Sequence, residues 1–153
     1  MKKFTFLLAL LPALFSSCFE GDRIIEEVAP NTFTQTYTVY WDTRKPYFWN
    51  EAYDDSGLYY YCTIEEPQLT KYIMNSGLTN AYLSYIPNGV EYPVLAPLPF
   101  SDFIVDPNND YKWEEHLTVE FATGLITFIL KIDDHASIEP FYPDYKFVVK
   151  FMW

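Results

Sequence analysis

The sequence contains few cysteines, few glycines and few basic residues. Its 153 residues include 2 Cys, 5 Gly and 10 Lys+Arg against 21 Asp+Glu, which gives a formal net charge of −11. This charge would repel the phosphates of a nucleic acid, so we do not expect a nucleic-acid partner. The sequence also lacks a Gly-rich phosphate loop, a nucleophile elbow and a cluster of His and Cys. It therefore predicts no cofactor and no particular reaction.

Apolar and aromatic residues are abundant instead. Half of the residues are hydrophobic and one fifth are aromatic, with 14 Tyr, 13 Phe and 4 Trp. This composition excludes a wholly disordered chain. The length fits one domain and leaves little room for a second.

Residues 1–17 have the pattern of an export signal. Two lysines precede an almost unbroken apolar run over residues 4–14, which is too short to cross a bilayer of about 30 Å. Ser16 and Ser17 then stand directly before Cys18. This ending resembles the cleavage box of bacterial lipoprotein precursors. The resemblance implies cleavage before Cys18, a lipid on its thiol and acylation of the new amino terminus.

Residues 18–32 are predicted to tether this lipid to the folded domain, because they contain four acids, one Pro and little periodicity. Loss of residues 1–17 removes two lysines and no acid, so the formal charge changes from −11 to −13. An anionic domain is not attracted by anionic lipids, and we therefore expect the lipid alone to anchor the protein. Glu20 and Asp22 resemble the surface-export signal of Bacteroidetes lipoproteins, which implies the outer membrane with the domain exposed at the cell surface.

The second cysteine, Cys62, has no intramolecular partner if Cys18 carries a lipid. It follows three tyrosines in a segment with the composition of a strand. We predict a buried, unreactive thiol rather than a catalytic nucleophile.

Residues 33–153 have the pattern of a single β-rich domain. Large β-branched and aromatic residues alternate with a period of two along several short segments, which are separated by turn signals such as Thr123-Gly124. Seven or eight such strands favour an antiparallel β-sandwich of the immunoglobulin-like or Greek-key type, with a small closed barrel as the main alternative. The predicted strands are 33–41, 58–65, 79–86, 90–95, 102–105, 113–122, 125–132 and 145–152.

One short helix is predicted over residues 67–76. Proline at its start fits the first turn, and Leu69, Tyr72 and Ile73 share one face at spacings of three and four. Gly77 follows at a position that suits a helix cap.

The order of these features is similar to that of small lipoproteins of gut Bacteroidetes, which are largely uncharacterised β-sandwich proteins. The resemblance covers most of residues 33–153 and implies the fold and the location, but no activity. The residues that carry it are Trp41, Tyr59 to Tyr61, Pro67 to Thr70, Gly77, Leu98 to Phe100 and Tyr145 to Val149.

Three aromatic residues, Trp41, Tyr47 and Trp49, are the candidate ligand-binding residues. Exposed Trp and Tyr rings stack on sugar rings, and they are also frequent anchors in protein interfaces. The alternative is that these residues fill the core of the sandwich, because Trp is highly buried on average.

Carboxylates offer weaker candidates. Glu65 or Glu66 together with Glu114 or Glu115 would form a hydrolase pair only if the fold brought them together, since neighbouring residues on a strand point to opposite faces. Two acidic segments invite a comparison with metal sites: residues 106–110, which we expect to form a turn, and Asp133, Asp134, His135 and Glu139, which we expect to form a solvated loop. We therefore predict no metal site and no catalytic residue.

These features together predict a membrane-anchored lipoprotein of the cell envelope that binds a partner without catalysing a reaction. The expected partner is another envelope protein or a matrix component. A glycan-binding accessory protein that uses Trp41, Tyr47 and Trp49 is the alternative, and a carboxylate-dependent hydrolase is a weaker one.

Overall fold

The structure is a computed structural model that describes residues 30–87, 89–105, 112–133 and 143–153. Within these ranges the chain forms nine β-strands and one α-helix. The strands are β1 (Thr32–Val39), β2 (Asn50–Asp54), β3 (Gly57–Glu65), β4 (Leu78–Tyr85), β5 (Val94–Pro97), β6 (Phe100–Val105), β7 (Lys112–Ala122), β8 (Leu125–Ile132) and β9 (Tyr145–Met152), and the helix is α1 (Lys71–Ser76).

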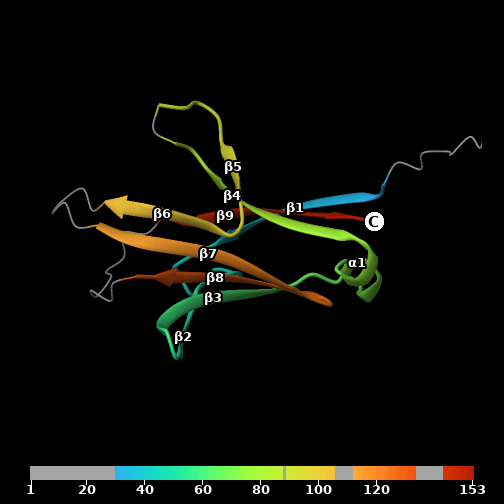
Figure 1. Ribbon diagram of the computed structural model, residues 1–153, viewed down its shortest axis with the longest axis horizontal. Helices are drawn as coiled ribbons and strands as arrows, with labels where there is room; N and C mark the ends of the chain where they lie inside the picture. The colour runs from blue at the N-terminus through green and yellow to red at the C-terminus, as the bar shows by residue number, and fades with distance from the viewer. Residues whose placement is uncertain (1–29, 88, 106–111, 134–142) are drawn as a thin grey trace, which may run out of the picture.

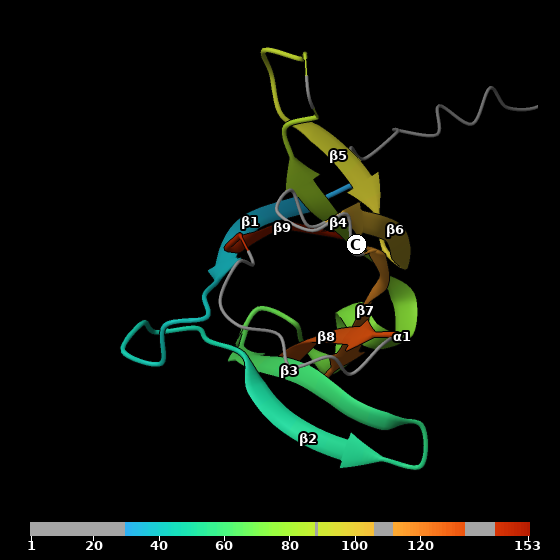
Figure 2. The same cartoon turned by 90° about the vertical axis from the view of Figure 1, so that its left-hand side faces the viewer.

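The nine strands form two sheets that face each other (Figure 1). One sheet has the order β1-β9-β4-β5 and the other the order β2-β3-β8-β7-β6, with antiparallel pairing between all neighbours. Seen end-on, the sheets curve around a shared interior (Figure 2). The prediction of an antiparallel β-sandwich is confirmed, with nine strands in the described ranges rather than seven or eight.

The core between the sheets consists of side chains from alternate residues of the strands. Every second residue of β8 and of β9 is buried, and the rings of Phe128 and Phe147 stack at 4.0 Å between centroids across the two sheets. Leu117 of β7 is buried in the same core, and Val119 and Phe121 of this strand are partly buried against it. Burial of large side chains from both sheets is the main source of stability in such a fold.

The helix is shorter than predicted and begins later. Thr70 is its N-cap and accepts a hydrogen bond from the backbone N–H of Ile73 at 3.3 Å, which is the usual role of Thr before a first turn. The placement of Pro67 in the first turn is therefore wrong. Tyr72, which was expected on the buried face, is 63% exposed, whereas Leu69 and Ile73 are buried. Among the described residues, no helix has the length and apolar character that a membrane span requires.

Gly77 ends the helix for a steric reason rather than through a left-handed backbone. Its N–H donates to the carbonyl of Ile73 at 2.8 Å, and its backbone is extended. A Cβ atom at this position would lie only 2.6 Å from the carbonyl oxygen of Met152 in β9. Glycine thus allows the helix to end directly against the neighbouring sheet.

Two strand predictions differ from the structure. The sequence did not predict β2, which contains Asn, Glu and Asp, residues that are depleted in strands. This strand forms because a tight turn pairs it with β3: the backbone N–H of Ser56 donates to Asp54 at 2.7 Å, and Gly57 has a φ of 116°. The strand expected at 90–95 instead begins at Val94, just after a proline, and continues to Pro97.

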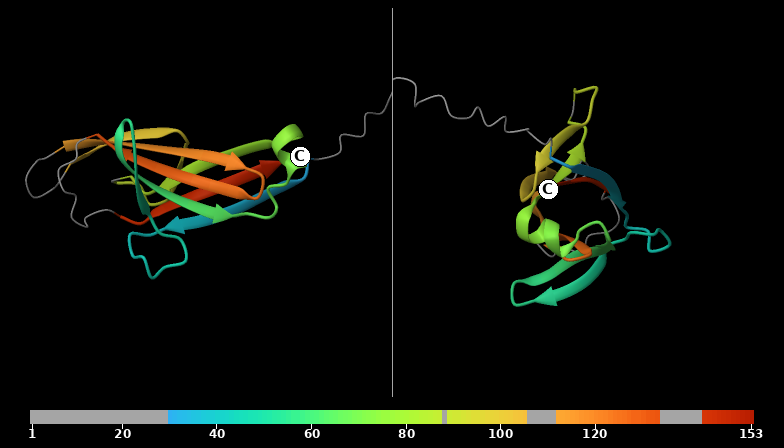
Figure 3. Two further views of the ribbon diagram at one scale, coloured as in Figure 1. Left: turned by 90° about the horizontal axis from the view of Figure 1, so that it is seen from below. Right: turned by 90° about the vertical axis from the view of Figure 1, so that its right-hand side faces the viewer.

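The ends of the described domain lie together. Asn31 and Trp153 exchange two backbone hydrogen bonds at 2.9 and 3.1 Å, and Figure 3 shows the C terminus beside α1. Leu78, the first residue of β4, pairs with Met152 at this same end. The last residue of β4, Tyr85, and the loop that follows it therefore lie away from the point where the chain enters the domain.

Candidate functional site

Of the three predicted aromatic residues, Trp49 belongs to the core, and Trp41 and Tyr47 are partly buried against it. Trp49 is 5% exposed, and its ring packs edge-on against that of Tyr145 at 5.7 Å between centroids. Trp41 is partly buried and inclined by 39° to Trp49, and Tyr47 is partly buried against Tyr37 with nearly perpendicular rings. A sugar-binding platform needs exposed, roughly coplanar rings. Trp49 is not exposed, and the rings of Trp41 and Trp49 are not coplanar, so core packing accounts for the position of Trp49.

The two glutamate pairs lie at opposite ends of the five-stranded sheet. Glu65 is paired with Leu125 at the start of β8, whereas Glu115 is paired with Ile132 at its end. Seven residues of extended chain separate these positions, which is about 23 Å. As expected for neighbours on a strand, Glu115 points into the core while Glu114 is on the outer face. The fold thus does not bring the glutamates together as a hydrolase would require.

Both buried glutamates instead connect the two sheets. Glu66 accepts a hydrogen bond from the hydroxyl of Tyr37 in β1. Glu115 accepts one from the hydroxyl of Tyr145 in β9 at 2.6 Å and another from the indole N–H of Trp113 at 3.0 Å. Burial raises the pKa of Glu115, and the two hydrogen bonds partly oppose this rise because they favour the carboxylate.

The raised pKa of Glu115 predicts a pH-dependent stability. A carboxyl whose pKa is higher in the folded than in the unfolded state contributes stability below its unfolded pKa. That contribution is lost as the pH rises from the ordinary value of 4.5 through the folded pKa. We expect Glu115→Gln to remove this loss, because an amide does not titrate and can still bond both partners. Urea unfolding of both proteins between pH 4 and 8 should show the variant gaining free energy of unfolding relative to wild type as the pH rises. Parallel curves would contradict the prediction.

Among the other candidate residues, the prediction of a buried Cys62 is confirmed, and most of the rest lie outside the described residues. Cys62 is 2% exposed, and burial raises the pKa of its thiol to about 11, which agrees with the predicted unreactive cysteine. Of the acidic loop, Asp133 is described, whereas Asp134, His135 and Glu139 lie outside the described residues. Cys18 and residues 106–110 lie outside them as well.

An apolar surface covers the hairpin that joins β4 to β5. This hairpin stands away from both sheets (Figures 1 and 2), and its large apolar side chains are exposed. Ile86 is 63% and Tyr92 70% exposed. We call this surface the hairpin patch; it consists of Tyr85, Ile86, Val90, Tyr92, Val94 and Leu95.

The outer face of the five-stranded sheet carries an open groove of about 380 Å³. Tyr59 and Tyr61 lie side by side in it, with 6.2 Å between ring centroids. Lys131 lies over the ring of Tyr59 and donates to Asp54 at 2.9 Å and to Ser56 at 2.8 Å. Hydrogen bonds lower the pKa of Asp54 to about 2. The largest effect comes from the Ser56 side chain and the next largest from Lys131. The groove is lined by Asp54, Tyr59, Tyr61, Thr118, Glu120, Thr127, Ile129 and Lys131.

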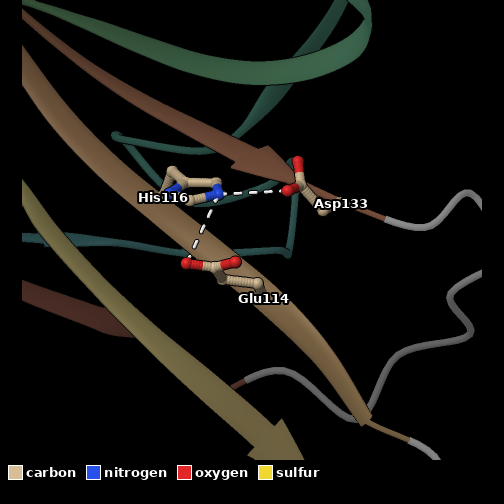
Figure 4. A group of neighbouring side chains, drawn as sticks. All are labelled: Glu114, His116 and Asp133. Carbon is tan, nitrogen blue, oxygen red and sulfur yellow. Dashed lines mark hydrogen bonds and ion pairs between the residues drawn. The ribbon is translucent and has the colours of Figure 1, made fainter.

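A cluster of Glu114, His116 and Asp133 lies on the outer face of the same sheet (Figure 4). Glu114 and His116 are two residues apart on β7, and Asp133 directly follows β8, where its N–H donates to the carbonyl of Glu114 at 3.0 Å. The Nε2 atom of His116 is 3.3 Å from Asp133 Oδ2 and 3.8 Å from Glu114 Oε1. The other ring nitrogen, Nδ1, is 2.8 Å from the hydroxyl of Ser101 in β6.

This cluster was not predicted, because the loop that contains Asp133 shows no sign of it when it is considered alone. The signal was present in the hairpin formed by β7 and β8. The turn at residues 123–124 makes Ala122 oppose Leu125, and the same register makes Glu115 oppose Ile132. Extending that register by one residue places Glu114 opposite Asp133.

Comparisons with known proteins found no relative of this chain. No family model matches the sequence, and no curated protein or solved structure matches it either.

Proposed function

We propose that the chain is a lipid-anchored protein of the cell envelope, exposed at the surface of the outer membrane, whose sandwich is a non-catalytic binding module for another protein. The observation that carries the binding role is the hairpin patch. Six large apolar residues are exposed on one projecting hairpin, and a concentration of exposed apolar side chains on one element is a common mark of a protein-interaction surface.

The position of the hairpin patch fits a protein anchored through its amino terminus. A lipid on Cys18 would attach the domain through residue 30, which precedes β1 at the end where Asn31 and Trp153 pair. The patch follows the last residue of β4, away from that end. A partner bound to the patch would therefore lie away from the end at which the described domain begins.

The charges near the patch indicate the chemistry of the partner. The hairpin itself, residues 85–97, has one charged residue, Glu91, and Lys146 of β9 pairs with Ser84 at the base of the hairpin. Charges across protein interfaces are complementary as a rule. We infer a partner whose contact surface is apolar and places a lysine or arginine opposite Glu91.

Tyr92 is the residue at which this proposal is tested, because buried aromatic anchors dominate the energy of protein interfaces. A photo-cross-linking residue placed at position 92 in living cells is expected to capture one envelope protein, identified by mass spectrometry. Tyr92→Ser should then weaken binding of the purified partner by about tenfold or more.

Tyr53 provides the matched control. It is also an exposed tyrosine, at 76%, but it lies on β2 in the other sheet. We expect no capture of that partner from position 53 and an unchanged affinity for Tyr53→Ser. Equal capture from both positions, or equal affinity of wild type and Tyr92→Ser, would show that the hairpin patch is not the binding surface.

A further inference from the structure

Among the described residues, two carboxylates of the outer face oppose each other without a lysine or arginine partner. Glu114 and Asp133 occupy directly opposed positions on β7 and at the end of β8, and like charges at such positions destabilise a sheet. Lys131, the nearest lysine along β8, forms its ion pair with Asp54 instead. In the described ranges, neither carboxylate forms an ion pair with Lys or Arg, and both face the imidazole of His116.

The orientation of His116 provides a second and independent observation. Ser101 in the adjacent strand β6 contacts Nδ1 at 2.8 Å, so that Nε2 is directed toward the two carboxylates (Figure 4). Histidines that bind metal ions usually donate their other ring N–H to an oxygen atom, which fixes both the tautomer and the ring. Ser101 is placed to do this for His116.

We propose that Glu114, His116 and Asp133 form a binding site for a divalent transition-metal ion, with Zn²⁺ as the best fit. Ligand atoms about 2.0–2.1 Å from a tetrahedral Zn²⁺ lie about 3.4 Å from one another. The observed 3.3 Å between His116 Nε2 and Asp133 Oδ2 matches this value, and the ligand atoms of all three residues lie within 4.8 Å of one another. Glu114 supplies the third ligand atom, Oε1, which is 3.8 Å from His116 Nε2.

The types of ligand select the metal. One imidazole and two carboxylates suit Zn²⁺ and related transition-metal ions, whereas Ca²⁺ and Mg²⁺ prefer ligands that are all oxygen. His116 and Glu114 are partly buried and Asp133 is exposed, so the fourth position of the metal faces solvent. A water molecule or a side chain of a bound protein is the ligand expected there.

Isothermal titration of the purified, chelator-treated protein with ZnCl₂ tests the site. We expect one Zn²⁺ ion per chain and no comparable binding of CaCl₂. His116→Gln should weaken the affinity by at least tenfold, and Ser101→Ala by about tenfold, because removing the hydrogen-bond partner of a ligating histidine has an effect of that size.

Two matched controls separate this site from other groups that bind zinc. His135→Gln removes the other of the two histidines in the sequence, and Glu120→Gln removes a carboxylate from β7 outside the cluster. Both variants should bind Zn²⁺ with wild-type affinity. Loss of binding in His135→Gln but not in His116→Gln would overturn the proposal, as would equal affinity of wild type and His116→Gln.

A stability measurement distinguishes a metal site from a purely structural cluster. Glu114→Gln removes one of two opposed charges, so the metal-free variant should be at least as stable as the wild type. The same variant should lose the increase in Tm that Zn²⁺ gives the wild type through preferential binding to the folded state. An equal Zn²⁺-induced increase in both proteins would refute the assignment of Glu114 as a ligand.

Discussion

Replacement of Trp49 by alanine is expected to lower the free energy of unfolding by about 3–5 kcal/mol. The indole is 5% exposed and packs edge-on against the rings of Tyr145 and Phe147, at 5.7 and 6.3 Å between centroids. Alanine would leave a cavity between the two sheets and remove these contacts from a close-packed interior. Urea-induced unfolding followed by circular dichroism measures the change.

Trp153→Ala is the control for this prediction. Trp153 is 37% exposed at the end of the chain, and its link to Asn31 uses backbone atoms that the substitution retains. We expect a change of less than about 1 kcal/mol, as for most surface substitutions. If Trp49→Ala unfolds like the wild type but loses binding to an immobilised glycan, the indole serves recognition and its assignment to the core is wrong.

The strands buried on one face were the part of the fold that the sequence predicted best. The predicted boundaries of β8 and β9 agree with the structure, and those of β7 differ by one residue. In β8 and β9 each inward residue is large and apolar, and in β7 Glu115 is the exception, so that a shift by one residue would expose the apolar set. The burial of one face therefore determines the register, and the alternation of apolar and polar residues in the sequence shows which face is buried.

Segments held by tertiary contacts were predicted less well. Strand β2 has no apolar alternation and depends on its pairing with β3. The helix was extended too far toward its start, because Pro67 suits a first turn locally, whereas Thr70 provides the N-cap in the structure. Local preferences are weak terms, and tertiary contacts override them.

The cluster of Glu114, His116 and Asp133 could be predicted from the sequence only in part. Its three residues come from two strands whose pairing follows from a recognisable turn with Gly124 at a φ of 78°. The contact of His116 with Ser101 depends on β6, a strand that was predicted but not paired. The carboxylates were thus accessible to sequence reasoning, whereas the orientation of the imidazole required the sheet.

Replacement of Cys18 by alanine, in a protein whose residues 1–17 are exchanged for a secretory signal that is cleaved without a lipidated cysteine, is expected to transfer the protein from the membrane fraction to the soluble fraction. Each buried methylene of an acyl chain contributes about 0.8 kcal/mol to membrane binding, and two or more chains give stable attachment. Without the lipid, a domain with a formal charge of −13 would be repelled by anionic headgroups, since its acidic residues outnumber its basic ones by that margin after loss of residues 1–17. Fractionation of cells with detection of the protein by immunoblot measures the effect.

Cys62→Ala is the matched control, because it removes the other thiol of the chain from a buried position in β3. This variant should remain in the membrane fraction, and mass spectrometry of its amino-terminal peptide should show an acylated Cys18. If Cys18→Ala also remains with the membrane, the attachment resides in the domain. The hairpin patch, as an exposed apolar surface, would then be the first segment to test as the membrane contact, and the proposed protein partner would lose its main support.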